Sequence, residues 1–196
     1  MKSTQQKWYE SRLSNLSNKK WKKVLDVQKP YRKNLLSMNP GKTLDIGCGV
    51  GRYLKELPKG SVGIDHNEYC VSKLRQLELE AFVPKEFYKK FNPKKNSFDS
   101  LLLSHVMEHL KKNEQADILS GYLPFLKKGG KVIIFCPQEV GFRSDTTHIS
   151  FFSEKEFESI AKKLNLKIIE NKSFPFPRFF GRYFKYNEFV FLAIKN

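Results

Sequence analysis

Three glycines, Gly47, Gly49 and Gly51, follow a short apolar run and precede a helical pattern. Because glycine has no Cβ, the chain at these positions can turn sharply and let a ligand approach its backbone. The helix that follows offers unpaired N–H groups in its first turn. The spacing is G-x-G-x-G, whereas the dinucleotide fingerprint G-x-G-x-x-G needs a glycine at the position of Arg52. We therefore expect a cofactor loop that is not of the dinucleotide type. The alternative is a turn whose glycines serve geometry alone.

Asp65 is the second candidate for ligand binding, because it lies 18 residues after Gly47 at the end of another apolar run, residues 61–64. A carboxylate at the end of a strand can accept hydrogen bonds from both hydroxyls of a ribose. It can also cap a helix, and a helix is predicted to begin near Glu68. The glycine loop upstream favours ribose binding over the cap.

The segment from His105 to His109 fits H-x-x-E-H, a pattern in which two histidines bind zinc and Glu108 serves as base. Glu188 would be available as a third ligand. A zinc site would leave the glycine loop and Asp65 without a role, so we predict no metal. His109 is instead expected to pack against the sheet.

A polar cluster, Asp145, Thr147 and His148, follows the fifth predicted strand. A histidine at this place can accept a proton from a substrate hydroxyl, or hold the substrate by a hydrogen bond. The alternative is a network among the three side chains that fixes the loop. His148 is therefore the candidate catalytic residue.

Apolar runs of strand length alternate with helical patterns along the chain. The strands are predicted at residues 43–46, 61–64, 79–83, 98–103, 131–135, 166–170 and 188–194. The helices are predicted at residues 53–57, 68–77, 105–109, 117–126 and 153–164, the last with Ser153 and Glu156 as a capping box. Residues 127–130, Lys-Lys-Gly-Gly, are expected to end the helix before the fifth strand. This alternation predicts an α/β fold with a doubly wound, mostly parallel sheet.

Four of these segments, in order, resemble those of class I S-adenosylmethionine-dependent methyltransferases. Residues 45–51 match the family's first motif, Asp65 its acidic residue after the second strand, residues 97–110 its fourth strand and helix, and residues 129–134 its fifth strand. The loop from Asp145 to Ser153 is similar to a stretch of small-molecule members. The resemblance covers about residues 41–196 and implies a Rossmann-like seven-stranded sheet whose last strand is antiparallel.

The resemblance also implies a cofactor, S-adenosylmethionine, with S-adenosylhomocysteine as product. The glycine loop would follow its methionine part, Asp65 would bind the ribose, and Ser104 and His105 would lie near the sulfonium. The acid that relatives place after the third strand, against the adenine, has only Glu86 as its counterpart. The implied cofactor residues are Asp45, Gly47, Cys48, Gly49, Gly51, Asp65, His66, Glu86, Ser104 and His105.

The charge of the chain is +16, from 36 Lys and Arg against 20 Asp and Glu. Residues 1–43 hold 11 basic residues and two acidic ones, which gives +9 of this total. We predict that residues 1–40 form an N-terminal helical extension on the substrate side, and that residues 41–196 form the methyltransferase domain. A basic face of this kind attracts nucleic acid, an anionic membrane or an acidic substrate, or it simply solvates a helical surface.

The segment 174–191 contains nine of the 27 aromatic residues. Its middle, residues 175–186, adds proline, glycine and basic residues, which predicts a loop that covers an apolar substrate, touches a membrane or stacks on bases. Tyr9, Asp145 and Arg178 are the candidates for the substrate side of the site.

These observations predict methyl transfer to the oxygen of a small or lipid-linked acceptor. The alternatives are an RNA methyltransferase that uses the basic N-terminal face, and a non-catalytic binding protein with a cofactor fold. RNA is disfavoured because no Asn-Pro-Pro-Tyr or Asp-Pro-Pro-Tyr follows the fourth strand, where the chain has Leu103-Ser-His-Val106. Three scattered cysteines and the lack of an apolar run near 18 residues predict a cytoplasmic protein, peripheral at most to a membrane.

Overall fold

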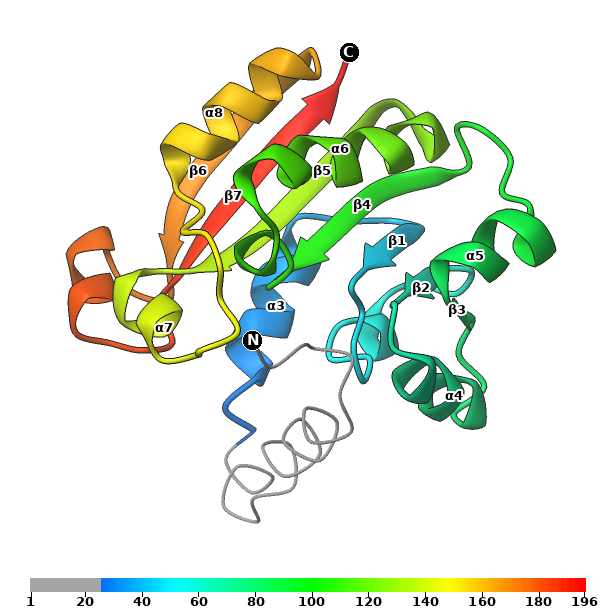
Figure 1. The fold of residues 1–196 in the computed structure, drawn as a ribbon, viewed down its shortest axis with the longest axis horizontal. Helices are drawn as coiled ribbons and strands as arrows, with labels where there is room; N and C mark the ends of the chain where they lie inside the picture. Colours follow the sequence, from blue (N-terminus) through cyan, green and yellow to red (C-terminus); the bar gives the residue numbers. More distant parts are fainter. Residues whose placement is uncertain (1–25) are drawn as a thin grey trace.

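The computed structural model describes residues 26–196, and a seven-stranded sheet forms its centre (Figure 1). The strands are β1 (Thr43–Ile46), β2 (Val62–Ile64), β3 (Ala81–Phe82), β4 (Phe98–Ser104), β5 (Leu126–Pro137), β6 (Leu166–Phe174) and β7 (Glu188–Lys195). Their order in the sheet is β3-β2-β1-β4-β5-β7-β6. Only β7 runs antiparallel to its neighbours, β5 and β6. The prediction of a mostly parallel sheet with an antiparallel last strand is confirmed.

The central strands are apolar on both faces because helices cover both sides of the sheet. Leu101, Leu102 and Leu103 of β4 have no exposed surface, and the same is true of Val132 and the two residues after it in β5. The strands pair in parallel register, with Leu101 opposite Val132. The unbroken apolar runs in the sequence are therefore explained by burial on both faces.

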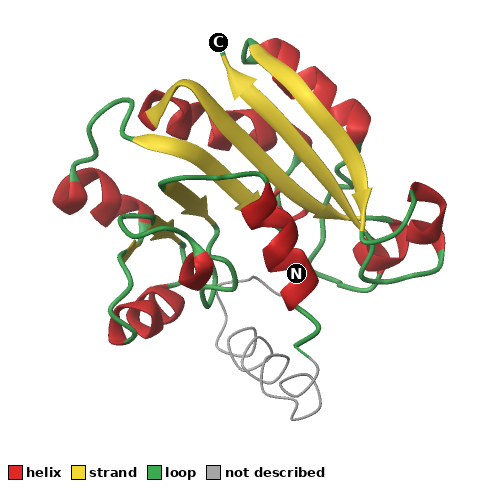
Figure 2. Ribbon diagram, turned by 180° about the vertical axis from the view of Figure 1, so that it is seen from behind, coloured by secondary structure: helices red, strands yellow, loops and turns green. Residues whose placement is uncertain are grey.

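Two layers of helices enclose the sheet, as Figures 1 and 2 show from opposite sides. On one face lie α3 (Lys29–Ser37) and α4 (Glu68–Gln76), which bury Leu35 and Leu74. On the other face lie α6 (Lys112–Tyr122) and α8 (Glu154–Lys163), which bury Leu119 and Phe157. The capping box of α8 is confirmed, since the Ser153 N–H donates to Glu156 Oε2 at 3.0 Å.

Helix α3 falls within the predicted N-terminal extension. Tyr31, Leu35 and Met38 join the core that α3 forms with the sheet, so the chain packs with the main domain from this helix onward. Pro30 occupies its first turn, where a proline costs no hydrogen bond. The rest of the extension, residues 1–25, lies outside the described residues.

Several helices are shorter than predicted. The predicted helices 53–57 and 105–109 are 3-10 turns, η1 (Leu54–Glu56) and η3 (Met107–His109). The helix predicted at 117–126 begins earlier, as α6, and ends in the 3-10 turn η4 (Leu123–Phe125). Residues 127–130 belong to β5 rather than to a break. The structure adds four elements, α5 (Pro84–Glu86), η2 (Phe87–Phe91), α7 (Glu139–Arg143) and η5 (Arg178–Arg182).

Replacing Phe191 by alanine tests the packing of β7. The Phe191 ring has no exposed surface and stacks on Phe157 of α8 with ring centroids 4.7 Å apart. We expect Phe191→Ala to lower the free energy of unfolding in urea by about 3–5 kcal/mol. The control, Tyr183→Ala, removes a ring that is 79% exposed, and should change it by less than about 0.5 kcal/mol. Equal losses in the two variants would contradict this account of the core.

Candidate active site

The glycine loop turns away from the sheet directly after β1. Gly47, Gly49 and Gly51 have φ angles of 73°, 51° and 78°, a region that favours glycine. A Cβ on Gly47 would lie 2.4 Å from Val106 Cγ2, and one on Gly51 would lie 2.4 Å from Leu74 Cδ2. A Cβ on Gly49 would meet no atom within 4 Å. The outer two glycines are therefore required for close packing, whereas Gly49 faces open space where a ligand can approach.

Asp65 ties the end of β2 to this loop. Its Oδ2 accepts a hydrogen bond from the Gly49 N–H at 2.7 Å, and its Oδ1 accepts one from the Asn67 N–H at 2.8 Å. A carboxylate oxygen has two acceptor sites, so each oxygen keeps one for a ligand. The cap of α4 is Asn67, whose Oδ1 accepts from Tyr69 N–H and Cys70 N–H. Asp65 therefore does not cap this helix, and that alternative is wrong.

Asp45 is the second carboxylate of this corner, on β1. Burial and then the charge of Asp65 raise its pKa to about 8. Burial likewise raises the pKa of the Cys48 thiol, so Cys48 lies in the wall as a neutral group. His66 is more exposed, with its Nδ1 3.6 Å from Asp65 Oδ1. Asp65 therefore places a carboxylate beside the open loop that suits a ligand with positive charge, whereas Asp45 is mostly a neutral carboxyl group at pH 7.

His105 follows Ser104, the last residue of β4, and lies between two carboxylates. Its Nδ1 is 3.1 Å from Glu108 Oε1, and its Nε2 is 2.9 Å from Glu188 Oε1. Burial alone would lower the pKa of His105, but Glu188 and Glu108 outweigh it and raise the value to about 9. Arg52 Nη2 lies 3.7 Å from Glu188 Oε1. His105 is thus a cation held by two acids, and both its nitrogens are used in those contacts.

The loop after α7 holds the other predicted cluster. Asp145 Oδ1 accepts hydrogen bonds from the Thr147 N–H at 3.0 Å and the Thr147 hydroxyl at 2.7 Å. His148 Nδ1 donates to the Phe142 carbonyl at 2.7 Å. A carbonyl only accepts, so this bond places the proton on Nδ1 and leaves Nε2 with a lone pair when the ring is neutral. The predicted loop-fixing network exists, and His148 still keeps one nitrogen for chemistry.

Three predicted site residues stand apart from these contacts. Glu86 pairs with Arg75 at 2.6 Å. Arg178 binds both carboxylate oxygens of Glu139. Tyr9 lies outside the described residues. The contact of Glu86 with adenine and the contacts of Tyr9 and Arg178 with the substrate therefore stay predictions.

Sequence reasoning missed two buried amides that position the site. Gln138 and Asn187 have no exposed surface, and Asn187 Nδ2 donates to Gln138 Oε1 at 3.0 Å. Gln138 Nε2 also donates to the backbone carbonyl of Glu188 at 3.1 Å. The only signal in the sequence was the polar pair Asn187-Glu188 at the start of an apolar strand.

Comparisons with protein families and with solved structures both identify methyltransferases as similar to this chain. A family model described as a methyltransferase domain matches residues 21–171. A Thermotoga maritima structure, described as an S-adenosylmethionine-dependent methyltransferase and possible histamine N-methyltransferase, shares 18% identity with a TM-score of 0.69, over 96% of this chain and 100% of its own. An Archaeoglobus fulgidus S-adenosylmethionine-dependent methyltransferase shares 19% identity with a TM-score of 0.62, over 88% and 99%.

Magnesium protoporphyrin IX methyltransferase of Synechocystis PCC 6803, solved with bound S-adenosylhomocysteine, is 16% identical with a TM-score of 0.61, over 87% of this chain and 86% of its own. No curated protein sequence matches the chain. At these identities the solved structures support the fold.

Histidine titration by NMR tests the charge of His105. Because its pKa is raised to about 9, the ring should stay protonated at pH 7.5 and lose its proton only near pH 9. Glu188→Gln removes one of the two charges that hold the proton, and should move the midpoint toward the ordinary value of about 6.5. The control, Glu170→Gln, removes an acid from β6 and should leave the midpoint unchanged. A wild-type midpoint near 6.5 would contradict the pairing.

Proposed function

The chain belongs to the class I S-adenosylmethionine-dependent methyltransferases, because the methyltransferase family model covers most of it, and we propose that it methylates an oxygen of a small or lipid-linked acceptor. The observation that carries the choice of acceptor is an exposed aromatic segment at the same edge of the sheet as the glycine loop. Calorimetry with S-adenosylhomocysteine and vesicle binding test the two halves of the proposal.

The residues at the loop fit the cofactor. Gly49 leaves its backbone open, and Asp65 keeps an acceptor site on each oxygen for the ribose hydroxyls. The Asp65 carboxylate suits a ligand with a cationic ammonium and sulfonium, and Asp45, mostly a neutral carboxyl group at pH 7, offers a hydrogen bond beside it. When bound, S-adenosylmethionine supplies the methyl group on a sulfonium, which makes it an electrophile. The protein then has mainly to align the acceptor with that carbon.

His148 is the residue proposed to prepare the acceptor. Its Nε2 lone pair can accept the proton of an acceptor hydroxyl, while the Phe142 carbonyl holds the ring through Nδ1. His105 is unsuited to this task because it is protonated at neutral pH and engaged by two acids. An oxygen acceptor agrees with the absence of a nucleic-acid base motif after β4.

Residues 175–186 connect β6 to β7, and Glu188 at the start of β7 pairs with Pro137 at the carboxyl end of β5. This pairing puts the segment at the ligand edge of the sheet. Five of its aromatic side chains are between 37% and 79% exposed, namely Phe176, Phe179, Phe180, Tyr183 and Tyr186. Arg182 and Lys185 are exposed among them. Aromatic and basic side chains together favour contact with an apolar acceptor at an anionic membrane surface.

No helix among residues 26–196 is both long enough and apolar enough to cross a membrane. On the evidence of the exposed aromatic and basic side chains, we propose contact with a membrane surface from the cytoplasmic side. The charge of +16 supports a second candidate, methylation of RNA, for which salt-dependent RNA binding would have to accompany methyl incorporation.

Calorimetry with S-adenosylhomocysteine tests the cofactor site. The wild type should bind it, and Asp65→Ala should weaken binding by about 10- to 150-fold, the loss of charged hydrogen bonds worth ~1.5–3 kcal/mol. The control, Asp117→Ala, removes an exposed acid of α6 and should bind like the wild type. No binding by the wild type, or undiminished binding by Asp65→Ala, would overturn the assignment.

Vesicle sedimentation tests the acceptor side. The variant Phe179→Ser/Tyr183→Ser should bind vesicles that contain phosphatidylglycerol at least about tenfold more weakly than the wild type, a loss of ~1.4 kcal/mol. Leu77→Ser, which removes one exposed apolar side chain after α4, is the matched control. Equal binding by all three proteins would leave the segment without a membrane role and favour a freely diffusing acceptor.

A further inference from the structure

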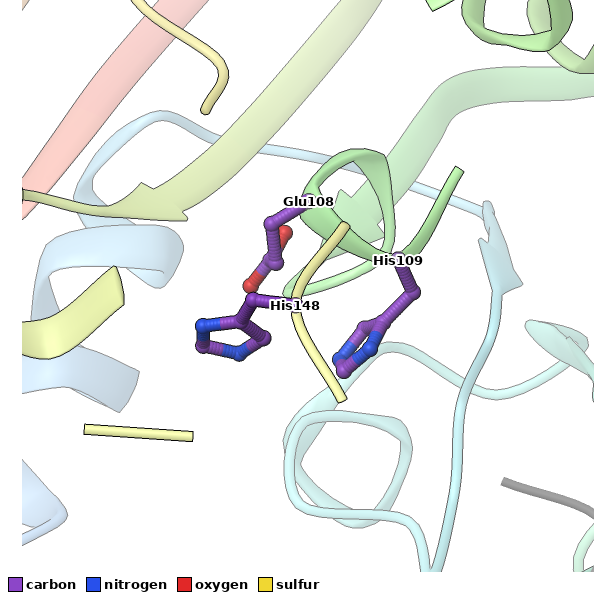
Figure 3. Close-up of side chains that lie close together, drawn as sticks. All are labelled: Glu108, His109 and His148. Carbon is purple, nitrogen blue, oxygen red and sulfur yellow. The ribbon is translucent and has the colours of Figure 1, made fainter. Parts of the chain in front are cut away.

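Three side chains with metal-binding atoms converge beside the predicted acceptor site. Glu108 and His109 come from η3, directly after β4, and His148 comes from the loop after α7 (Figure 3). One ligand atom from each lies within 4.8 Å of the others. The two imidazole rings meet edge to face, with centroids 4.8 Å apart. The chain thus gathers two histidines and one carboxylate at a single point of the ligand edge.

Glu108 shows that this cluster is incomplete on its own. The side chain has no exposed surface; its Oε1 contacts His105, and its Oε2 has no hydrogen-bond partner among the described residues. The neighbouring Cys136 thiol hydrogen-bonds this carboxylate, but a thiol is a weak donor. A buried carboxylate oxygen without a strong donor is costly to retain, which points to a further partner.

The two histidines are oriented in the way that metal ligands usually are. His148 Nδ1 donates to the Phe142 carbonyl at 2.7 Å, and His109 Nδ1 donates to the Thr147 carbonyl at 3.2 Å. Both bonds fix the tautomer and leave Nε2 of each ring with its lone pair. Each histidine thus has one nitrogen in a backbone contact and one able to bind a cation.

The backbone holds the two halves of the cluster together. The N–H groups of Ile149 and Ser150 both donate to the Glu108 carbonyl, at 2.8 and 3.2 Å. Gln115 Nε2 donates to the Met107 carbonyl and to the Ser150 hydroxyl, at 3.0 and 2.9 Å. The loop that carries His148 is therefore fastened to the turn that carries the other two ligands.

We propose that Glu108, His109 and His148 bind one divalent transition-metal ion, Zn²⁺ in the first instance. Two imidazoles and one carboxylate form a set that Zn²⁺ takes at catalytic sites, whereas Mg²⁺ and Ca²⁺ prefer oxygen ligands throughout. Metal–ligand bonds of about 2.1 Å in a tetrahedral site place the ligand atoms about 3.4 Å apart. The three ligand atoms lie within 4.8 Å of one another, so side-chain movements of roughly an ångström bring them to bonding distance. The site departs from the prediction of no metal, and it is not the site that the H-x-x-E-H pattern describes, because Glu108 is a ligand rather than a base and His105 pairs with acids instead.

Three protein ligands leave a coordination position for the acceptor, and this role rests on the proposed function. The acceptor hydroxyl binds the ion there, which lowers its pKa, and its O–H bond breaks with the proton passing to water. The oxygen then uses a lone pair to form the bond to the methyl carbon. The S–C bond breaks with its electron pair going to sulfur, which leaves neutral S-adenosylhomocysteine. On this account His148 acts through the ion rather than as a free base.

The test is calorimetric titration of the full chain, stripped with EDTA, with Zn²⁺ alone. We expect one ion per chain, with a Kd below about 1 µM, and weakening by at least ~100-fold in His148→Ala and in Glu108→Gln. His66→Ala, which removes an exposed histidine outside the cluster, should bind Zn²⁺ like the wild type. Circular dichroism checks that each variant folds, and His109→Ala replaces Glu108→Gln if the latter does not.

The outcomes separate this proposal from the proposed function. Weak Zn²⁺ binding by the wild type, or equal affinity in His148→Ala and His66→Ala, overturns the metal site even if S-adenosylhomocysteine still binds. Tight Zn²⁺ binding that depends on the three ligands supports the site even if the chain binds no S-adenosylhomocysteine. Replacement of Zn²⁺ by Co²⁺ should add visible absorption bands, which His148→Ala should lose.

Discussion

The contact between Glu188 and His105 joins the last strand of the chain to the end of β4, and the ligand edge depends on it. The two residues are 83 positions apart, and their side chains meet at 2.9 Å because β7 runs antiparallel beside β5 and so begins where β5 ends. Glu188 is almost fully buried. A buried carboxylate needs a charged, hydrogen-bonded partner, since removing one member of such a pair costs several kcal/mol.

From this contact a chain of alternating charges runs across the site. Arg52 of the glycine loop approaches Glu188, Glu188 holds His105, and His105 holds Glu108. Two positive and two negative groups balance, so the row can be buried without a net charge. This row of charges links the glycine loop to the turn after β4. The loop that contains His148 is hydrogen-bonded to the same turn. One connected network therefore fixes the proposed cofactor and acceptor sites relative to each other.

The sequence predicted the parts of this structure that depend on local pattern. The apolar runs of β1, β4 and β5, the glycine loop and the capping box at Ser153 follow from residue type and spacing, and the structure confirms them. The prediction of a helix at residues 105–109 was wrong, because His105 has a φ of 56° that a helix does not allow. The hydrogen-bond partners of Asp65 could not be predicted from the sequence pattern either, because they are backbone N–H groups whose positions depend on how the glycine loop folds back.

The least predictable features join distant segments. The sequence offered Glu188 only as a third ligand of a zinc site that we did not predict, whereas in the structure it is the partner of His105. His148 and Glu108 lie 40 residues apart, and only the fastening of their loop to η3 shows that they share a site. A sequence pattern shows which groups are available, whereas tertiary pairing decides which of them meet.

A crystal structure of the protein soaked with S-adenosylhomocysteine tests the central claim most directly, namely that the edge formed by the glycine loop and β4 holds the methyl donor. The account predicts density for the ligand over Gly49, with both ribose hydroxyls within about 3.2 Å of the Asp65 carboxylate and the sulfur toward Ser104 and His105. Ligand density elsewhere on the molecule, or a ribose without contact to Asp65, would contradict it.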